Sequence, residues 1–218
     1  MKKRNKLIQF GEDVEGYKIP VLNEREIRAS AGILFLFMFI SLMLILFKED
    51  FLMIKYVIII FLTDLVIRVF VNPKFSPLLI TGRLIVSRQV PEYVGAAQKK
   101  FAWKIGIVLA GLMFIFLVIV NSYSIFTGLT CFICLVFLFF ESAFGICLGC
   151  WVYGWFYKEK AQYCSGEVCD ATKKQEIQKI SWVQLLILLG LILFVILMIF
   201  FFDHQLGEKP RNLWEIIN

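Results

Sequence analysis

Long apolar runs separated by short polar segments dominate the pattern of this chain. Crossing the hydrocarbon core of a bilayer takes about 20 helical residues, so each run is a candidate membrane-spanning helix. The predicted spans cover residues 29–47, 51–71, 95–120, 125–150 and 180–202. None of the five alternates apolar and polar residues as a half-buried strand would. The pattern therefore predicts helices throughout.

Polar and proline residues mark where these helices start and stop. Asn23, with Glu26 three positions later, has the spacing of an N-cap, so the first helix should begin before the membrane. Pro73 and Pro77 forbid continuation of the second run. Pro91 is predicted to open the third spanning helix, which runs through Val120.

A shorter apolar segment lies between the second and third spans. Residues 78–88 are too few to cross a bilayer and include Arg83 and Arg88. We therefore interpret this segment as interfacial or re-entrant.

Composition supports the same class of protein. Hydrophobic residues make up 60% of the 218, and Phe is the most frequent aromatic residue. A soluble domain has far fewer hydrophobic residues. We predict an all-α membrane protein, a bundle of about five transmembrane helices forming a single domain over residues 29–203. The bilayer is its expected surrounding.

Basic residues predict the orientation of this bundle. Seven lie in the first 28 residues, seven between Arg68 and Lys104, and five between Lys158 and Lys179. Cytoplasmic loops carry an excess of Lys and Arg, so these three segments should face the cytoplasm. The chain is then a multi-pass protein of the cell (inner) membrane, with a cytoplasmic leader at 1–28 and an extracytoplasmic tail at 204–218.

Several classes of function are disfavoured by what the sequence contains. His204 is the single histidine, which excludes mechanisms that use several histidines. No glycine-rich phosphate loop or nucleic-acid-binding pattern occurs, so no nucleic-acid partner is expected.

The six cysteines form three close pairs within residues 131–169. The pairs are Cys131/Cys134, Cys147/Cys150 and Cys164/Cys169. The first pair lies in a Phe-rich membrane run, where cysteine often serves as a small apolar residue, and we favour packing for it. The other two pairs are predicted to meet water, where packing cannot explain them.

Cys147 and Cys150 are the candidate catalytic residues, because a CxxC pair at a helix end is accessible to a partner. Cys164 and Cys169, in a polar loop, are then candidate resolving thiols. The same four cysteines also have the spacing of a zinc clamp that would hold this loop, so zinc is a candidate cofactor. The spacing alone leaves both readings open.

Helix geometry limits how these thiols could exchange. Thirteen residues separate Cys134 from Cys147, or about 20 Å along a continuous helix, too far for direct exchange. A helix C-terminus disfavours a thiolate, so activation of Cys147 would need Lys158, Lys160 or a partner.

Charged residues within the apolar runs are a second candidate site. A carboxylate in the membrane costs about 3 kcal/mol on insertion scales, so such residues are often functional. We predict a polar pocket formed by Asp64, Arg68, Lys99 and Glu141. It serves as a structural ion-pair network or as a substrate or proton site. On one continuous helix, Glu141 would face away from Cys147 and Cys150.

Four segments carry a family resemblance. They begin at Val21 (VLNEREIRA), Asn72 (NPKFS), Pro91 (PEYVGAAQKKFAW) and Phe140 (FESAFGICLGC). They resemble a bacterial integral-membrane family classed as a domain of unknown function. Relatives are sometimes fused to thioredoxin-like or rhodanese-like domains. The resemblance implies sulfur or disulfide chemistry and a cytoplasmic thioredoxin-like or rhodanese-like partner.

Three hypotheses follow. The leading one is thiol/disulfide or sulfur-related redox chemistry through the CxxC pair, with the chain acting as a membrane thiol–disulfide oxidoreductase. One alternative is a transporter that binds a small anion or sulfur species in the polar pocket. The other is a structural membrane module with a zinc clamp.

Overall fold

The computed structural model describes residues 9–148 and 181–212, apart from residues 15, 18 and 209. Six α-helices form most of it: α1 (Glu24–Lys48), α2 (Leu52–Val66), α3 (Pro77–Ile85), α4 (Ala96–Phe114), α5 (Ile125–Phe139) and α7 (Trp182–Gly207). Single π-helical turns, η1 (Ile67–Val71), η3 (Ile115–Ile119) and η4 (Phe140–Phe144), continue α2, α4 and α5, and η2 (Pro73–Phe75) is a 3-10 turn. The predicted all-α class is confirmed.

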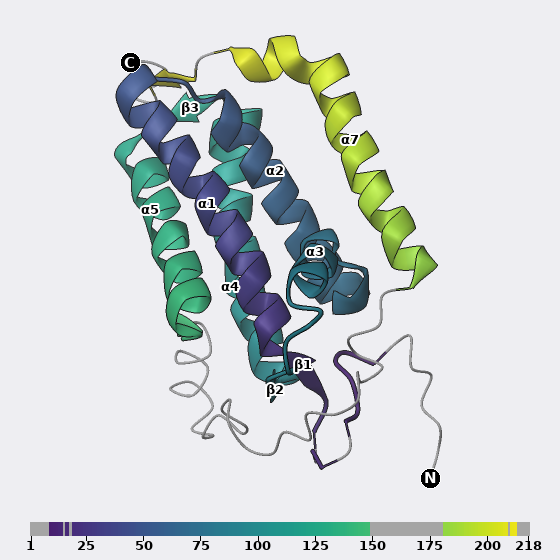
Figure 1. Ribbon diagram of the computed structural model, residues 1–218. Helices are drawn as coiled ribbons and strands as arrows, with labels where there is room; N and C mark the ends of the chain where they lie inside the picture. The colour runs from purple at the N-terminus through teal and green to yellow at the C-terminus, as the bar shows by residue number, and fades with distance from the viewer. Residues whose placement is uncertain (1–8, 15, 18, 149–180, 209, 213–218) are drawn as a thin grey trace.

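Four very short strands lie at the two ends of the bundle (Figure 1). β1 (Val21–Asn23) pairs antiparallel with β2 (Tyr93–Gly95). β3 (Ser122–Tyr123) pairs in parallel with β4 (Arg211–Asn212). We call the two ends of the molecule the β1–β2 end and the β3–β4 end.

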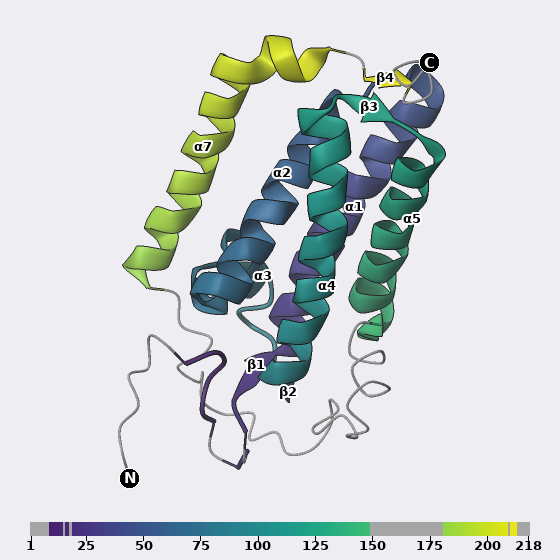
Figure 2. The same cartoon turned by 180° about the vertical axis from the view of Figure 1, so that it is seen from behind.

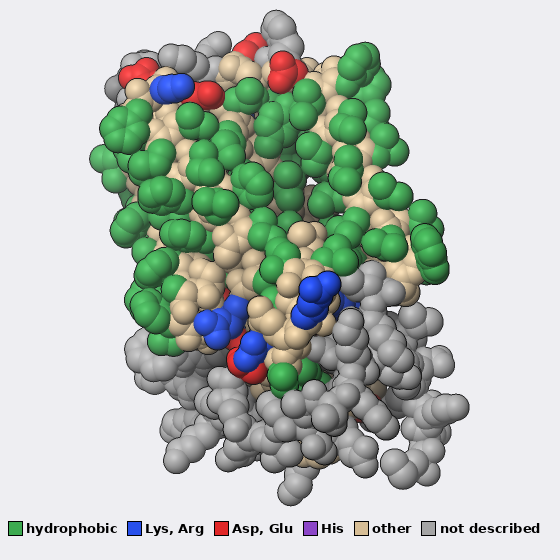
Figure 3. All heavy atoms as spheres, viewed as in Figure 1, with side chains coloured by type: hydrophobic (Ala, Val, Ile, Leu, Met, Phe, Trp, Pro, Cys, Tyr) green, Lys and Arg blue, Asp and Glu red, His purple; other side chains and the backbone are tan. Residues whose placement is uncertain are grey.

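The described helices make the chain a membrane protein. By length and composition, four of them could cross a bilayer: α1, α4 with η3, α5 with η4, and α7. Figure 3 shows hydrophobic side chains over the middle of the visible face, with charged side chains toward its two ends. This distribution is the one a bilayer requires, because charged groups stay at its surfaces.

The predicted second span is also helical, but unlike these four helices it carries three buried charged residues in its apolar run. α2 and η1 together cover Leu52–Val71. They carry Lys55, Asp64 and Arg68, each of which is buried inside the bundle. The polar groups therefore point into protein, as ionisable residues at membrane depth usually do. The number of five spans remains a prediction.

The core lies where α1, α2, α4 and α5 meet. α1 contacts α2, α3 and α5, and α4 contacts α2 and α5. Ile27, Leu34, Ile58, Leu65 and Met113 are among the buried residues of one continuous cluster. Helices α2 and α4 approach closely, since a Cβ added at Gly106 would lie 3.0 Å from the Leu65 side chain.

The start of the third span differs from the prediction. Residues 91–95 were expected in the first turn of a helix, but 93–95 form β2 and the helix begins at Ala96. Val21 pairs with Gly95 and Asn23 with Tyr93 across the two strands. Because of this pairing, the N-terminal segment is held against the start of α4.

The first helix, α1, begins directly after Asn23, the residue predicted to cap it. The Asn23 side chain accepts a hydrogen bond from the Arg25 backbone N–H at 3.2 Å and donates to Glu26 at 3.0 Å. The short segment after the second span is also present, as α3, which packs against α1. Ser76 caps α3 by accepting from the Leu79 backbone N–H.

Helix α7 stands apart from the other helices in both views (Figures 1 and 2). Most of its apolar side chains are exposed, and it is attached near its two ends. At one end, the Gln184 amide donates to the Lys74 carbonyl at 3.1 Å. At the other, the buried Lys55 ammonium donates to the Leu206 and Glu208 carbonyls and to the Asn121 side chain.

Gly82 permits the contact between α3 and α1. A Cβ at this position would lie 2.5 Å from the Glu26 carbonyl oxygen and 3.2 Å from the Ser30 nitrogen, both backbone atoms. We expect Gly82→Ala to lower stability by about 1–3 kcal/mol through overpacking, measured by thermal unfolding in detergent. Gly111→Ala is the control, because a Cβ there meets no atom within 4 Å. Equal unfolding temperatures for the two variants would contradict this packing.

Candidate functional site

Lys99 forms the centre of a buried ion cluster that joins three helical elements. Its ammonium lies 3.0 Å from Glu24 Oε2 and 2.6 Å from Glu141 Oε1. Lys99 is only 1% exposed. A buried ammonium is tolerated when carboxylates surround it, and here α1 and η4 each supply one to the lysine of α4.

The β1–β2 pairing explains how these residues meet. It sets the first turn of α1, which contains Glu24, beside the first turn of α4, which contains Lys99. Sequence reasoning had predicted Lys99 and Glu141 for one pocket, and they form an ion pair. It missed Glu24, because the start of the first helix was expected to lie before the membrane. A three-residue strand has too little periodicity to reveal this contact.

Arg68 forms a second buried cluster on the same side of the bundle. Its Nε donates to Asp64, another residue of the predicted pocket, at 2.6 Å, and its Nη2 donates to Ser30 of α1 at 2.6 Å. The Trp103 ring of α4 lies 5.1 Å from the guanidinium carbon, within cation–π range. Arg68 thus links η1 with α1, α2 and α4.

Asp64 also holds the start of α3. Its second oxygen accepts from the Ser76 hydroxyl at 2.6 Å and from the Leu78 backbone N–H at 2.9 Å. A carboxylate at a helix N-terminus satisfies N–H groups that lack partners within the helix. This part of the predicted pocket therefore has a clear structural role.

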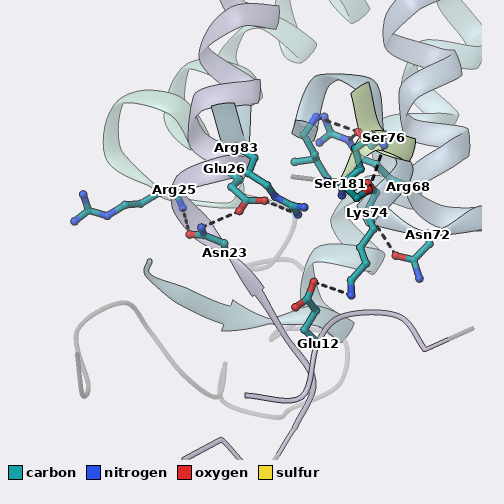
Figure 4. Close-up of polar contacts among 12 residues, drawn as sticks. Glu12, Asn23, Arg25, Glu26, Arg68, Asn72, Lys74, Ser76, Arg83 and Ser181 are labelled. Carbon is teal, nitrogen blue, oxygen red and sulfur yellow. Dashed lines mark hydrogen bonds and ion pairs between the residues drawn. The ribbon is translucent and has the colours of Figure 1, made fainter. Parts of the chain in front are cut away.

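A further buried ion pair lies nearer the β1–β2 end, as Figure 4 shows. Arg83 of α3 donates to Glu26 of α1 at 3.0 Å, and Asn23 donates to the same carboxylate. Lys74 and Glu12 form a more exposed pair at 3.0 Å. Sequence reasoning missed Glu26 as a partner of Arg83, because the residues are far apart in the chain.

Helix α5 with η4, which corresponds to the fourth predicted span, ends earlier than predicted. This earlier end changes the position of Cys147. The span was expected to continue to Cys150, but helical structure stops at Phe144 and Gly145 is left-handed, with φ of 68°. A glycine in this conformation is a common helix C-cap. Cys147 therefore follows a turn, and the helical-wheel argument that set it opposite Glu141 is wrong.

Cys147 and Glu141 line one cavity between the four core helices. The cavity has a volume of about 60 Å³, and Arg68, Trp103 and Cys134 also contribute to its wall. That volume holds a few water molecules or a sulfur species of similar size. One cavity thus brings together two thiols, a carboxylate and a guanidinium.

Arg28 lies at the helix end next to this turn. Its guanidinium donates to the Ala143 carbonyl at 3.2 Å, and a Cβ at Gly145 would lie 3.3 Å from it. A cation at a helix C-terminus offsets the negative end of the helix dipole. From the sequence, activation of Cys147 was expected to come from Lys158, Lys160 or a partner. Both lysines lie outside the described residues, and Arg28 was not among the expected groups.

Of the other five cysteines, two lie in the core and three lie outside the described residues. Cys131 and Cys134 are buried in the core, in agreement with the predicted packing role. Cys150, Cys164 and Cys169 lie outside the described residues, so the resolving role and the zinc clamp remain predictions. Within the described residues, no group of three potential His, Cys, Asp or Glu ligands could hold a metal ion.

The two clusters and their surroundings carry charges of both signs. Glu24, Asp64 and Glu141 supply three carboxylates, and Arg68 and Lys99 supply two buried cations. Arg28, whose positive charge also acts on Glu24, adds a third cation at their edge. Each of the two buried cations has a carboxylate within 3.0 Å or less.

These features define a helical-bundle membrane protein with a small cavity near one end, lined by apolar side chains together with two thiols, a carboxylate and a guanidinium. The chain matches the family model described as Domain of unknown function (DUF4395) over residues 22–158, more than half of its length. It belongs to that family, and the predicted membership of a family of unknown function is confirmed. No curated protein and no solved structure matches the chain.

Replacement of Lys99 tests the buried cluster. Lys99→Met leaves two carboxylates buried without their cation, which typically costs about 3–5 kcal/mol. We expect a large drop in the unfolding temperature in detergent, partly restored when Glu24→Gln and Glu141→Gln are added.

Arg25→Met is the matched control, because Arg25 pairs with Glu92 at 2.6 Å but is about one-third exposed. Exposed pairs contribute about 1 kcal/mol or less. Equal destabilisation by Lys99→Met and Arg25→Met would contradict the central role of the Lys99 cluster.

Proposed function

We propose that this chain is a membrane thiol–disulfide oxidoreductase that exchanges reducing equivalents with a cytoplasmic thioredoxin-like or rhodanese-like protein. The observation that carries the proposal is the position of Cys147. The turn at Gly145 sets this cysteine at the wall of a cavity shared with Glu141 and Arg68. A thiol at the end of a helix, beside polar groups, is positioned for exchange rather than for packing.

The proposed reaction needs two thiols and one partner disulfide. The Cys147 thiolate attacks a sulfur of the partner disulfide, and the other partner sulfur leaves as a thiolate. Cys150 then attacks the Cys147 sulfur, which releases the second partner sulfur. Two electrons pass from the CxxC dithiol to the partner, and the CxxC pair becomes a disulfide. Cys164 and Cys169 would re-reduce it by the same exchange.

Two nearby groups would support this reaction. Arg28 contributes a positive charge at the helix end two residues before Cys147, and cations favour thiolate over thiol. Glu141 lines the same cavity as Cys147 and could take up the proton released by the thiol. Because Lys99 is 2.6 Å from Glu141, that proton could also be shared with Glu24.

The orientation argued from basic residues fits this role. With the β1–β2 end in the cytoplasm of the cell, Cys147 faces the compartment that contains thioredoxin-like proteins, whose disulfide form is the electron acceptor of the exchange. The anion-transport alternative has less support, because Arg68 and Lys99 are already paired with carboxylates. The zinc-clamp alternative rests on Cys150, Cys164 and Cys169, which are outside the described residues.

A redox titration tests the exchange reaction. The full chain in lipid nanodiscs is equilibrated with dithiothreitol buffers of graded potential, quenched in acid and alkylated with a mass tag. We expect Cys147 and Cys150 to change together in one two-electron transition. The transition should disappear in Cys147→Ser and persist in Cys131→Ser, the buried-core control. A Cys147 that stays reduced at every potential would overturn the proposal.

The role of Arg28 is tested by the alkylation rate of Cys147. We expect Arg28→Met to slow its reaction with iodoacetamide several-fold at neutral pH, because the cation that favours the thiolate is lost. Arg25→Met is the control, because Arg25 lies near Arg28 in α1 but pairs with Glu92. This variant should leave the rate unchanged. Rates that match in the two variants would show that Arg28 does not activate the thiol.

A further inference from the structure

A second and larger cavity lies at the β3–β4 end, far from Cys147 along the bundle. It has a volume of about 420 Å³, within the range of about 300–1,000 Å³ typical of small-molecule sites. The last turns of α1, the first turns of α2 and α5, and the end of α4 with η3 enclose it. None of the residues proposed for thiol exchange lines it.

The walls of this cavity suit an uncharged apolar ligand. Leu42, Ile45, Met113 and Leu117 are among the residues that form them. Among the described residues that line the cavity there is no Lys or Arg, and Glu49 is the single acidic one. An anion would find no cation here, whereas burial of an apolar molecule is favourable.

Two hydroxyls at this end can donate to a ligand, those of Ser124 and Tyr123. In the capping box of α5, Ser124 Oγ accepts from the Thr127 backbone N–H and keeps its own hydrogen, whereas the Thr127 hydroxyl donates to the Ser124 carbonyl. Tyr123 lines the cavity as well, and its ring lies 5.4 Å from the Phe51 ring. A tyrosine hydroxyl can donate to a carbonyl, and the aromatic pair offers a flat apolar surface.

The cavity reaches along α5 to a buried thiol. Gly128 lines it, and a Cβ added at Gly128 would meet no atom within 4 Å. Cys131, one helical turn further on, also lines it and is 3% exposed. A ligand in the cavity would therefore lie against Gly128 and limit access to the Cys131 sulfur.

We propose that this cavity binds an uncharged, lipid-soluble molecule with an apolar tail and a carbonyl-bearing head. The head accepts a hydrogen bond from Tyr123, and the tail packs against the leucine and isoleucine side chains of α1. Leu46, which lines the cavity and is 70% exposed, lies where the tail would meet the bilayer. Two membrane components share this chemistry: prenyl quinones and neutral acylglycerol lipids.

Direct binding to the full chain in nanodiscs is the test. Two probes are used separately, the short-chain quinone ubiquinone-1 and dioctanoylglycerol, and bound probe is measured after equilibrium dialysis. We expect saturable binding of one molecule per chain for at least one probe. Tyr123→Phe should weaken it several-fold. Quinone binding alone identifies the quinone source, and acylglycerol binding alone identifies the lipid source.

Two glycine variants locate the site. Gly128→Leu fills the cavity and should abolish saturable binding. Gly111→Leu is the matched control, because a Cβ at Gly111 also meets no atom within 4 Å but Gly111 does not line the cavity. In a chain whose only cysteine is Cys131, the bound probe should also slow alkylation by N-ethylmaleimide several-fold. Absence of saturable binding by both probes, or equal binding in the two glycine variants, would overturn the proposal.

Discussion

The arrangement at the β1–β2 end depends on the need to neutralise a buried lysine. Lys99 lies inside the bundle and cannot reach water, so it requires carboxylates from its neighbours. Glu24 and Glu141 meet this requirement, and in doing so they fix α1 and η4 against α4. The pairing of β1 with β2 brings Glu24 into reach, which makes the short N-terminal strand part of the same constraint.

The buried arginine extends this constraint to the rest of the bundle. Arg68 requires Asp64 and Ser30, and Asp64 in turn holds the start of α3 through Ser76 and a backbone N–H. Polar networks of this kind specify one packing, because each alternative would leave a charge without a partner. The cavity next to Arg68 is therefore enclosed by helices whose relative positions are determined by buried charges.

The opposite end is organised differently. There Lys55 is satisfied by two backbone carbonyls near the end of α7 and by the side chain of Asn121, so it attaches a helix rather than closing a core. The larger cavity at this end is bounded mainly by apolar side chains. The two ends therefore offer different spaces, a small one beside Cys147 whose lining includes the charged Arg68 and Glu141, and a larger one beside Cys131 that no Lys or Arg among the described residues lines.

The sequence by itself determined the class of the protein and the location of its helices. Apolar runs such as 31–47 contain no charged residue over a length that suits a bilayer, and Asn23 and Pro73 mark ends through local hydrogen bonding and sterics. It also predicted that Asp64, Arg68, Lys99 and Glu141 would gather in one polar pocket, because an ionisable group in such a run must find an opposite charge.

Only the tertiary structure decided which other residues complete the site. Glu24 reaches Lys99 through a strand pairing between segments about 70 residues apart, and such short strands leave no periodic signal. Gly145 is a helix stop in the folded chain, although a glycine within an apolar run is equally compatible with a continuing helix. That stop sets Cys147 beside Glu141, because a position along the chain becomes a position in space only when the helix end and its neighbours are known.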